Sequence, residues 1–317
     1  MKVSEPITIL IPIRNGIQFV LEAIESIESN IFGLDEVIAI DDGSTDGTSE
    51  ILASWQAKNS RVRILPGSSS GLVDALNLGL QNASNKWVAR FDVDDSYSLN
   101  RLSEQRKWIN TNVALIFSDY EIKSINNLPL GTIHSAVFHP AVSLSLITSS
   151  RTPHPVALMN RMIALEAGGY KLADFPAEDL SLWLRMSRLG SLVSVPLPLL
   201  HYRIHEDSIT SNKSEEMKLK TKELVNYFGI CSQDLAILEQ TWAEIYTDYR
   251  FFTYSDERRI LFLRDLFALS RLYPELTWVK KAKLSILVKL LSNPLVIYKI
   301  FVMKLKQTSR RSQRKAG

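Results

Sequence analysis

The residues best suited to chemistry are three aspartates, Asp92, Asp94 and Asp95, which directly follow an apolar segment at residues 87–91. Carboxylates this close together repel one another unless a cation lies among them. Oxygen ligands suit Mg²⁺ or Mn²⁺, which take few ligands from a protein and the rest from phosphate and water. A solvated acidic turn explains the same residues, because aspartate is common in loops. The segment alone leaves both interpretations open.

A second polar loop, residues 41–47, follows another short apolar segment at residues 37–40. Its glycines and hydroxyl residues permit a tight turn and close approach of a ligand, and a carboxylate there could accept a hydrogen bond from a base N–H. Taken alone, the loop fits better as a turn that caps the next helix.

Apolar runs and helix-period segments alternate over the first 120 residues and would position both loops. The apolar run at residues 7–13 predicts a strand buried on both faces. This order predicts an α/β fold with an open, mostly parallel sheet and helices on both faces, in which ligands bind at the carboxyl ends of strands. Both polar loops fall at such ends. The predicted strands are 7–13, 37–40, 62–65, 87–91 and 114–118, and the predicted helices are 48–57, 72–81 and 99–109, with a further helical pattern at Ile17, Val20, Leu21, Ile24 and Ile27.

The pattern changes after residue 120. Residues 126–155 indicate a long loop with short helical pieces, and residues 178–189 indicate a helix. Pro196 and Pro198 make residues 193–200 an edge strand or an extended connector. Helical patterns follow residue 212, so we predict a catalytic domain at 1–215 and a helical C-terminal region at 216–317.

Composition narrows the class of protein. With 317 residues, 45% hydrophobic and 22% charged, the chain has the composition of a globular protein. Its single cysteine, Cys231, excludes an internal disulfide and a cysteine-based zinc site. A cytoplasmic location is expected.

Charge is concentrated in the tail. Residues 280–317 hold eleven Lys and Arg and no acidic residue, which leaves 26 basic and 34 acidic residues in the remainder. The acidic body argues against nucleic acid as a partner. Lys289, Pro294 and Lys299 interrupt the apolar segment 284–305, so a helix lying in an anionic membrane interface is predicted rather than a spanning one. A helix packed on the catalytic domain, followed by a disordered basic end, is the alternative.

Taken together, these segments resemble glycosyltransferase family 2, the inverting enzymes with the GT-A nucleotide-sugar fold. The resemblance covers roughly residues 5–212 and is specific for the family but not for the substrate. It rests on residues 12–15, 41–47, 71–77 and 89–95, on Arg101 and Gln105, and on residues 154–155, 168–170, 178–179 and 202–205.

For the donor, the resemblance implies that Pro12, Arg14 and Asp42 line the base pocket, with Asp42 accepting the uracil N3–H. Members of the family often have an aromatic residue at the position of Arg14, and a guanidinium plane could stack in its place. Arg90 would neutralise diphosphate charge or serve as a structural ion-pair partner. Asn77 would contact the nucleotide or only fix its loop.

For the metal and the sugar, the resemblance implies that Asp92 holds the ribose or the hydration shell of Mn²⁺ or Mg²⁺. Asp94 and His205 would bind the metal, and Asp95 would face the donor sugar. His201 is a weaker candidate than His205.

For the acceptor, Asp179 matches the catalytic base of the family, with Glu178, His154 and Gly169 shaping the sugar pockets. A position at the start of a helix would by itself lower the pKa of Asp179 and weaken it as a base.

The resulting expectation is a metal-dependent inverting transferase that moves a sugar from a nucleotide sugar, UDP-linked above others, to a saccharide or lipid-linked acceptor in glycan synthesis. It would act in the cytoplasm, peripheral to the inner face of the cell membrane. A sugar-nucleotide nucleotidyltransferase and a non-catalytic nucleotide-sugar binding protein remain the alternatives. A dinucleotide-dependent oxidoreductase is excluded, because no Gly-x-Gly-x-x-Gly follows the first strand.

Overall fold

The computed structural model describes residues 5–137, 141–148, 152–206 and 208–229. The chain divides into two compact units, residues 1–234 and 235–317. The second unit lies outside the described residues, so every element and site residue that follows belongs to the first. Among the described residues, no helix is long and apolar enough to cross a membrane.

The first half of this unit alternates strands and helices as the sequence predicts. The run from Ile7 to Ile13 is a strand with every residue buried. The elements are β1 (Ile7–Ile13), α1 (Val20–Glu28), β2 (Glu36–Asp41), α2 (Thr48–Lys58), β3 (Val62–Pro66), α3 (Leu72–Asn82), β4 (Trp87–Arg90), β5 (Ser96–Tyr97), α4 (Arg101–Arg106) and β6 (Val113–Ser124).

The second half contributes shorter strands and the helices on one side of the sheet. Its elements are β7 (Pro129–Ile133), α5 (Ala141–Thr148), the 3-10 turn η1 (His154–Val156), β8 (Leu158–Asn160), α6 (Arg161–Glu166), η2 (Leu172–Asp174), α7 (Glu178–Met186), β9 (Ser191–Ile204), α8 (Ile209–Asn212) and α9 (Ser214–Phe228).

The described strands form one nine-stranded sheet in the order β3-β2-β1-β4-β8-β6-β9-β5, with β7 paired to β6. Strands β3, β2, β1 and β4 are parallel to their neighbours, as are β6 and β9. The short strand β8 runs antiparallel between β4 and β6. The predicted α/β fold with a mostly parallel sheet is therefore confirmed.

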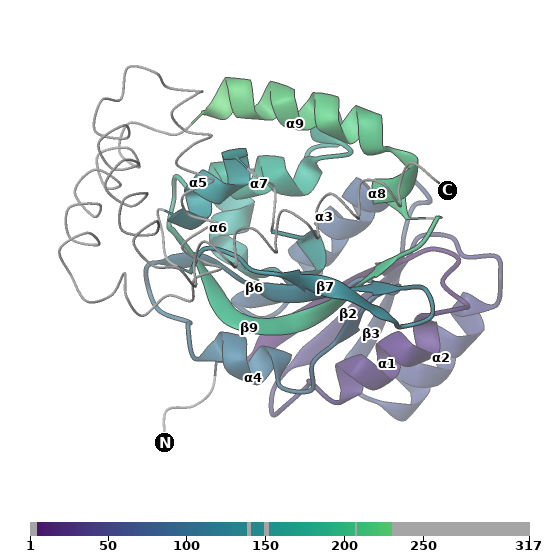
Figure 1. Ribbon diagram of the computed structural model, residues 1–317. Helices are drawn as coiled ribbons and strands as arrows, with labels where there is room; N and C mark the ends of the chain where they lie inside the picture. The colour runs from purple at the N-terminus through teal and green to yellow at the C-terminus, as the bar shows by residue number, and fades with distance from the viewer. Residues whose placement is uncertain (1–4, 138–140, 149–151, 207, 230–317) are drawn as a thin grey trace, which may run out of the picture. The chain divides into compact units, whose positions relative to one another are not determined.

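Helices cover both faces of this sheet (Figure 1). Helices α1, α2 and α4 lie on one face, while α3, α5, α6 and α7 lie on the other, where α9 packs on α7. Helix α3 approaches closely because Gly79 faces the sheet. A Cβ there would overlap the Leu10 side chain and come within 2.8 Å of Ile40 Cδ1. Helix α3 therefore packs directly against β1 and β2.

Some sequence expectations differ from the structure. Ile17 and Leu21, predicted in an apolar helix face, are 41% and 61% exposed, because the buried face of α1 consists of Val20, Ala23 and Ile27. The predicted helix at residues 99–109 is shorter, as α4 ends at Arg106.

The region expected to be a loop with short helical pieces, residues 126–155, contains the strand β7 and the helix α5, and β8 follows it. The predicted strand at residues 114–118 extends to Ser124. The proline-containing segment is a strand: β9 pairs with β6 along its length and with β5 only at Leu200 and His201. The boundary predicted near residue 215 falls at the start of α9. Most of the helical C-terminal region lies outside the described residues, so this division stays a prediction.

Candidate active site

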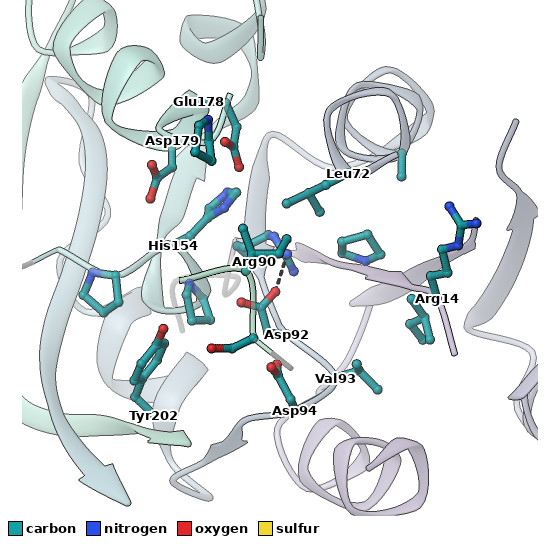
Figure 2. A pocket seen from close by; sticks show the side chains of 18 of the residues that line it. Arg14, Leu72, Arg90, Asp92, Val93, Asp94, His154, Glu178, Asp179 and Tyr202 are labelled. Atoms are coloured by element: carbon teal, nitrogen blue, oxygen red, sulfur yellow. Dashed lines mark ion pairs between the residues drawn. The ribbon is translucent and has the colours of Figure 1, made fainter. Parts of the chain in front are cut away.

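A cleft of about 870 Å³ opens at the carboxyl ends of β1 and β4 and is bounded on the other side by α7, α8 and α9. Most of the residues singled out from the sequence line it, and Figure 2 shows several of them pointing into this space. The predicted residues in the lining are Pro12, Arg14, Asp42, Arg90, Asp92, Asp94, His154, Glu178, Asp179 and His205.

Three predicted residues lie outside this lining. Asn77 holds Tyr170 by two hydrogen bonds: its Nδ2 donates to the Tyr170 carbonyl and its Oδ1 accepts from the Tyr170 N–H, both at 2.9 Å. Gly169 packs beside the same amide, with φ at +62°. Asp95, in the acidic loop after β4, is 2% exposed and does not line the cleft. Asn77 therefore fixes the Tyr170 backbone, and neither Asn77 nor Gly169 lines the cleft.

One end of the cleft is formed by Pro12, Arg14 and Asp42. Asp42 is 4% exposed, and its Oδ2 accepts a hydrogen bond from the Gly71 N–H at 2.9 Å. Its Oδ1 is buried and has no hydrogen-bond partner among the described residues. Gly67 allows this fit, since a Cβ there would lie 2.5 Å from Oδ1. A buried acceptor with a free lone pair suits a ligand N–H.

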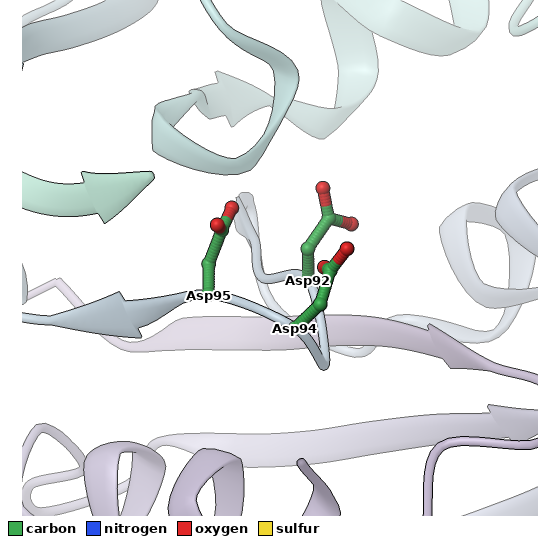
Figure 3. A group of neighbouring side chains, drawn as sticks. All are labelled: Asp92, Asp94 and Asp95. Carbon is green, nitrogen blue, oxygen red and sulfur yellow. The ribbon is translucent and has the colours of Figure 1, made fainter. Parts of the chain in front are cut away.

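The acidic loop after β4 gathers Asp92, Asp94 and Asp95 on one side of the chain (Figure 3). One carboxylate oxygen from each lies within 4.8 Å of the others. Asp94 Oδ2 lies 2.8 Å from His205 Nε2, which brings together the two residues predicted to bind the metal. Asp95 accepts a hydrogen bond from the Arg203 N–H at 2.8 Å through Oδ1, while its Oδ2 is buried without a partner among the described residues.

Electrostatics within this loop favour a cation. Burial raises the pKa of Asp95 well above its usual range, and the charges of Asp94 and Asp92 raise it further. Burial also raises the pKa of Asp92, although the Arg90 guanidinium opposes this shift. A divalent ion would remove the repulsion and give the unpartnered oxygen of Asp95 a favourable charge nearby. The donor set of carboxylates and one imidazole fits Mn²⁺ or Mg²⁺ with open positions for phosphate and water.

Arg90 is 2% exposed and forms an ion pair with Asp92, marked in Figure 2. Arg101, buried behind it, donates a hydrogen bond to the Arg90 carbonyl at 2.8 Å and lies over the Phe91 ring. Of the two roles expected for Arg90, the structure therefore contains the ion pair, formed at the edge of the cleft.

Asp179 and Glu178 begin α7 and face the acidic loop across the cleft (Figure 2). Asp179 Oδ1 accepts a hydrogen bond from the Leu180 N–H at 2.6 Å. Glu178 is 5% exposed, and its Oε2 has no partner among the described residues.

Burial raises the pKa of Asp179 to about 6, although backbone N–H groups oppose the shift. Burial and the adjacent Asp179 charge raise the pKa of Glu178 to about 8. The expectation that the helix start would lower the pKa of Asp179 is therefore wrong, because desolvation outweighs the helix dipole and the backbone donors. A carboxylate with a pKa near 6 suits a general base close to neutral pH, while Glu178 keeps its proton there.

His154 lies between α7 and the acidic loop. Its Nε2 is 2.8 Å from Tyr170 Oη, and its ring packs edge-on against Trp183 with centroids 5.6 Å apart. Burial lowers the pKa of His154 well below its usual range, so the imidazole is neutral. Asn77 holds the backbone of Tyr170, and the Tyr170 hydroxyl in turn fixes the orientation of His154. His201 lies elsewhere, 3.6 Å from Glu121.

Sequence reasoning missed several cleft residues. Tyr120 was missed because the predicted strand stopped at residue 118, whereas β6 continues through it. Trp183 falls in the helix expected at residues 178–189, in which only Glu178 and Asp179 were assigned a role in the site. Met217 and Thr221 come from α9, whose place beside the cleft follows from tertiary packing. Only Tyr120, two residues beyond a predicted strand end, carried a usable signal.

With this geometry established, comparison with known proteins identifies the family. The sequence model described as "Glycosyl transferase family 2" matches residues 8–166, half of the chain. The chain belongs to glycosyl transferase family 2. The matched region of this family member includes β1 from Thr8 onward, the loop after β2 and the acidic loop. Asp179 and His205 lie beyond it.

Curated relatives carry glycosyltransferase names. An uncharacterized glycosyltransferase of Rickettsia felis is 30% identical over 200 residues, covering 62% of this chain and 33% of that protein. The chain thus spans about a third of the length of such relatives. The Escherichia coli protein "UDP-Glc:alpha-D-GlcNAc-diphosphoundecaprenol beta-1,3-glucosyltransferase WfgD" is 25% identical over 219 residues, covering 67% of this chain and 82% of that one.

Solved structures support the same fold. The mannosyltransferase PcManGT of Pyrobaculum calidifontis, solved with GDP-Man and Mn²⁺, superimposes with a TM-score of 0.58 at 16% identity. The match covers 91% of this chain and 87% of that one. At this identity the likeness concerns the fold, which is that of a GT-A glycosyltransferase.

Proposed function

We propose that this chain is an inverting glycosyltransferase that moves a hexose from a UDP-sugar to a saccharide hydroxyl, with Asp179 as the base and Asp94 at a divalent metal. The observation that carries the proposal is the arrangement in one cleft of a buried N–H acceptor, a cluster of three carboxylates and, facing them, a carboxylate with a pKa near 6.

The donor end is supported by Asp42. Its unpartnered Oδ1 would accept the N3–H of uracil, and the buried Pro12 backbone would close one side of the base. Exposed Arg14 would lie flat against the ring or approach a phosphate. An N–H acceptor favours uracil, thymine or guanine over cytosine, and the name of the Escherichia coli relative favours uracil among these.

The diphosphate would lie over the acidic loop. A bound Mn²⁺ or Mg²⁺ would supply Lewis-acid stabilisation of the departing diphosphate. Asp94 and His205 would hold the ion, with Asp92 fixed by Arg90 beside it. Asp95, held by the Arg203 backbone, would present its second oxygen towards the donor side of this loop.

The reaction would be a single displacement. Asp179 would accept the proton of the acceptor hydroxyl as that oxygen forms its bond to C1 of the sugar. The bond from C1 to the diphosphate oxygen would break on the opposite face, and the electron pair would leave with the diphosphate. Inversion at C1 follows, and no separate general acid is required.

Glu178 and His154 would act as neutral hydrogen-bonding groups around the sugars. Glu178 keeps its proton at neutral pH and is able to donate to a sugar oxygen, while Asp179 beside it remains an acceptor. His154, oriented by Tyr170, would hold a sugar hydroxyl without adding charge. The two adjacent carboxyl groups would thus have opposite hydrogen-bonding roles because their pKa values differ.

The setting we propose is polysaccharide or other glycan assembly in the cytoplasm at the inner face of the membrane, with a lipid-linked saccharide as one form of acceptor. The name of the Escherichia coli relative, which includes a diphosphoundecaprenol-linked sugar, supports this choice. The basic tail at 280–317 lies outside the described residues, so its attachment to anionic lipid stays a prediction. Deleting residues 280–317 and finding membrane association unchanged would contradict it.

Family membership favours sugar transfer over nucleotidyl transfer, and the raised pKa of Asp179 favours an enzyme over a binding protein. Calorimetric titration of UDP, dTDP, GDP, CDP and ADP with and without Mn²⁺ tests the donor site. We expect Mn²⁺-dependent binding of UDP that Asp94→Ala abolishes and that Asp74→Ala, which alters an exposed aspartate outside the cleft, leaves intact. Failure of every diphosphate to bind would contradict the proposal.

A further inference from the structure

Two tyrosines lie on the same face of the neighbouring strands β6 and β9. Tyr120 pairs with Leu200, and Ile122 pairs with Tyr202, so the two rings are diagonal neighbours in a parallel register. Side chains two positions apart along a strand point to the same face. The ring centroids of Tyr120 and Tyr202 are 6.1 Å apart and the planes meet at 71°.

This pair lines the cleft at the end opposite the base pocket. Strand β1, which leads into Arg14, is separated from β6 and β9 by β4 and β8. Figure 2 shows Tyr202 on the same side of the acidic loop as Asp179, with Arg14 on the other side. A donor extending from Asp42 to Asp94 would therefore place its reactive carbon between the acidic loop and the tyrosines.

The cleft has room beyond a donor. Small-molecule sites have volumes of about 300–1,000 Å³, and this cleft, at about 870 Å³, lies near the upper end of that range. The arginines that line it among the described residues are Arg14, at the base end, and Arg90, which is paired with Asp92. His205, also in the lining, lies against Asp94. His154 is neutral. The tyrosine end thus offers aromatic surface without positive charge.

Such a surface has a preferred ligand chemistry. The face of an aromatic ring is electron-rich and attracts weakly positive hydrogens. A pyranose ring presents axial C–H groups on one face and hydroxyls around its rim, so it lies flat on an aromatic ring while its hydroxyls reach polar neighbours. Thr152 and Ser208, which line the same cleft, also carry hydroxyl groups.

We propose that Tyr202 and Tyr120 form the acceptor platform, on which a pyranose ring of the acceptor stacks with one hydroxyl directed at Asp179. The proposal rests on the proposed function and adds the acceptor class: a neutral sugar ring occupies the cleft. If the acceptor carries a phosphate, that phosphate would stay outside the cleft. Among the described residues, no arginine or lysine without an acidic partner lines the tyrosine end.

The test measures saccharide binding separately from nucleotide binding. Saturation-transfer NMR would be recorded on the full chain with UDP and Mn²⁺ present, using the methyl glycosides of glucose, galactose and N-acetylglucosamine as probes. The variants are Tyr202→Ala, Tyr202→Phe and Tyr120→Ala. Tyr227→Ala serves as the matched control, because Tyr227 lies on α9, is 80% exposed and does not line the cleft.

We expect at least one glycoside to receive saturation on its C–H face, and its affinity to fall about tenfold or more in Tyr202→Ala. Tyr202→Phe and Tyr227→Ala should bind as the parent chain does, and UDP affinity should be unchanged in all variants. Tyr120→Ala should weaken binding of the glycoside and leave binding of UDP unchanged. This pattern separates loss of the platform from loss of folding.

Two results would overturn the platform while leaving the proposed function intact. One is equal glycoside binding by Tyr202→Ala, Tyr120→Ala and the parent chain. The other is no glycoside binding by a protein that binds UDP with Mn²⁺. Failure of UDP itself to bind would instead refute the proposed function, so the two failures are distinguishable.

Discussion

Replacing Asp179 with asparagine should abolish turnover and at the same time stabilise the folded protein at neutral pH. The activity loss follows from removing the base, which contributes roughly 10²–10⁴-fold in enzymes of this kind. The stabilisation follows from the pKa of about 6, because the unfolded chain holds this proton less tightly than the folded one does.

The sign and magnitude follow from the direction of the shift. A carboxyl group whose pKa is raised by folding contributes its stability below the unfolded pKa, near 3.8, and loses it as the pH rises through about 6. The shift of about two units corresponds to about 3 kcal/mol at ~1.36 kcal/mol per unit. Asp179 keeps some exposure in the cleft, so we expect Asp179→Asn to gain about 1–3 kcal/mol at pH 7.5 relative to its effect at pH 4. The asparagine Oδ1 can still accept the Leu180 N–H.

Urea unfolding of the parent chain and of Asp179→Asn at both pH values measures this difference. Asp74→Asn is the matched control, because Asp74 also lies in the first turn of a helix but is exposed. Its carboxylate interacts favourably with the helix dipole, so its removal should cost up to about 1 kcal/mol at pH 7.5 and leave activity intact. Destabilisation by Asp179→Asn at pH 7.5 would identify Asp179 as a capping residue and refute the reasoning.

Three further predictions concern turnover, donor affinity and packing. In the parent chain, kcat/KM should fall about tenfold per pH unit below about 6, where Asp179 becomes protonated; a flat profile down to pH 4.5 would argue against this base. Asp42→Ala should weaken UDP binding in calorimetry by about 10–100-fold, because one buried hydrogen bond to a charged group contributes about 1.5–3 kcal/mol. Unchanged affinity would mean that the uracil ring binds elsewhere. Gly79→Ala should lower the free energy of unfolding by about 1–3 kcal/mol, because its Cβ overlaps Leu10, and a variant as stable as the parent would mean that α3 can shift away from β1.

The sheet could be predicted where strands are buried on both faces. The unbroken apolar run Ile7–Ile13 marks β1 because parallel strands covered by helices carry no polar alternation. The polar loops after β2 and β4 could be placed together because the carboxyl ends of parallel strands lie at the same edge of a sheet. Short antiparallel strands such as β7 and β8 escaped prediction, because three to five residues carry too little periodicity.

The site was predictable as a set of residues more than as an arrangement. The family motifs name Asp94, His205 and Asp179, yet the pairing of Asp94 with His205 depends on β9 returning beside β5, far along the chain. The pKa of Asp179 was misjudged because the sequence shows a helix start and not the burial around it. Tyr120 joins the cleft only because β6 continues past its apolar core.

The most direct test of the account is release of UDP from a panel of UDP-sugars in the presence of Mn²⁺. We predict that the parent chain releases UDP from at least one of them, that Asp94→Ala fails to bind the donor, and that Asp179→Asn binds it without releasing UDP in the presence of acceptor. No release from any UDP-sugar by the parent chain, or equal release by the parent and Asp179→Asn, would contradict the central claim.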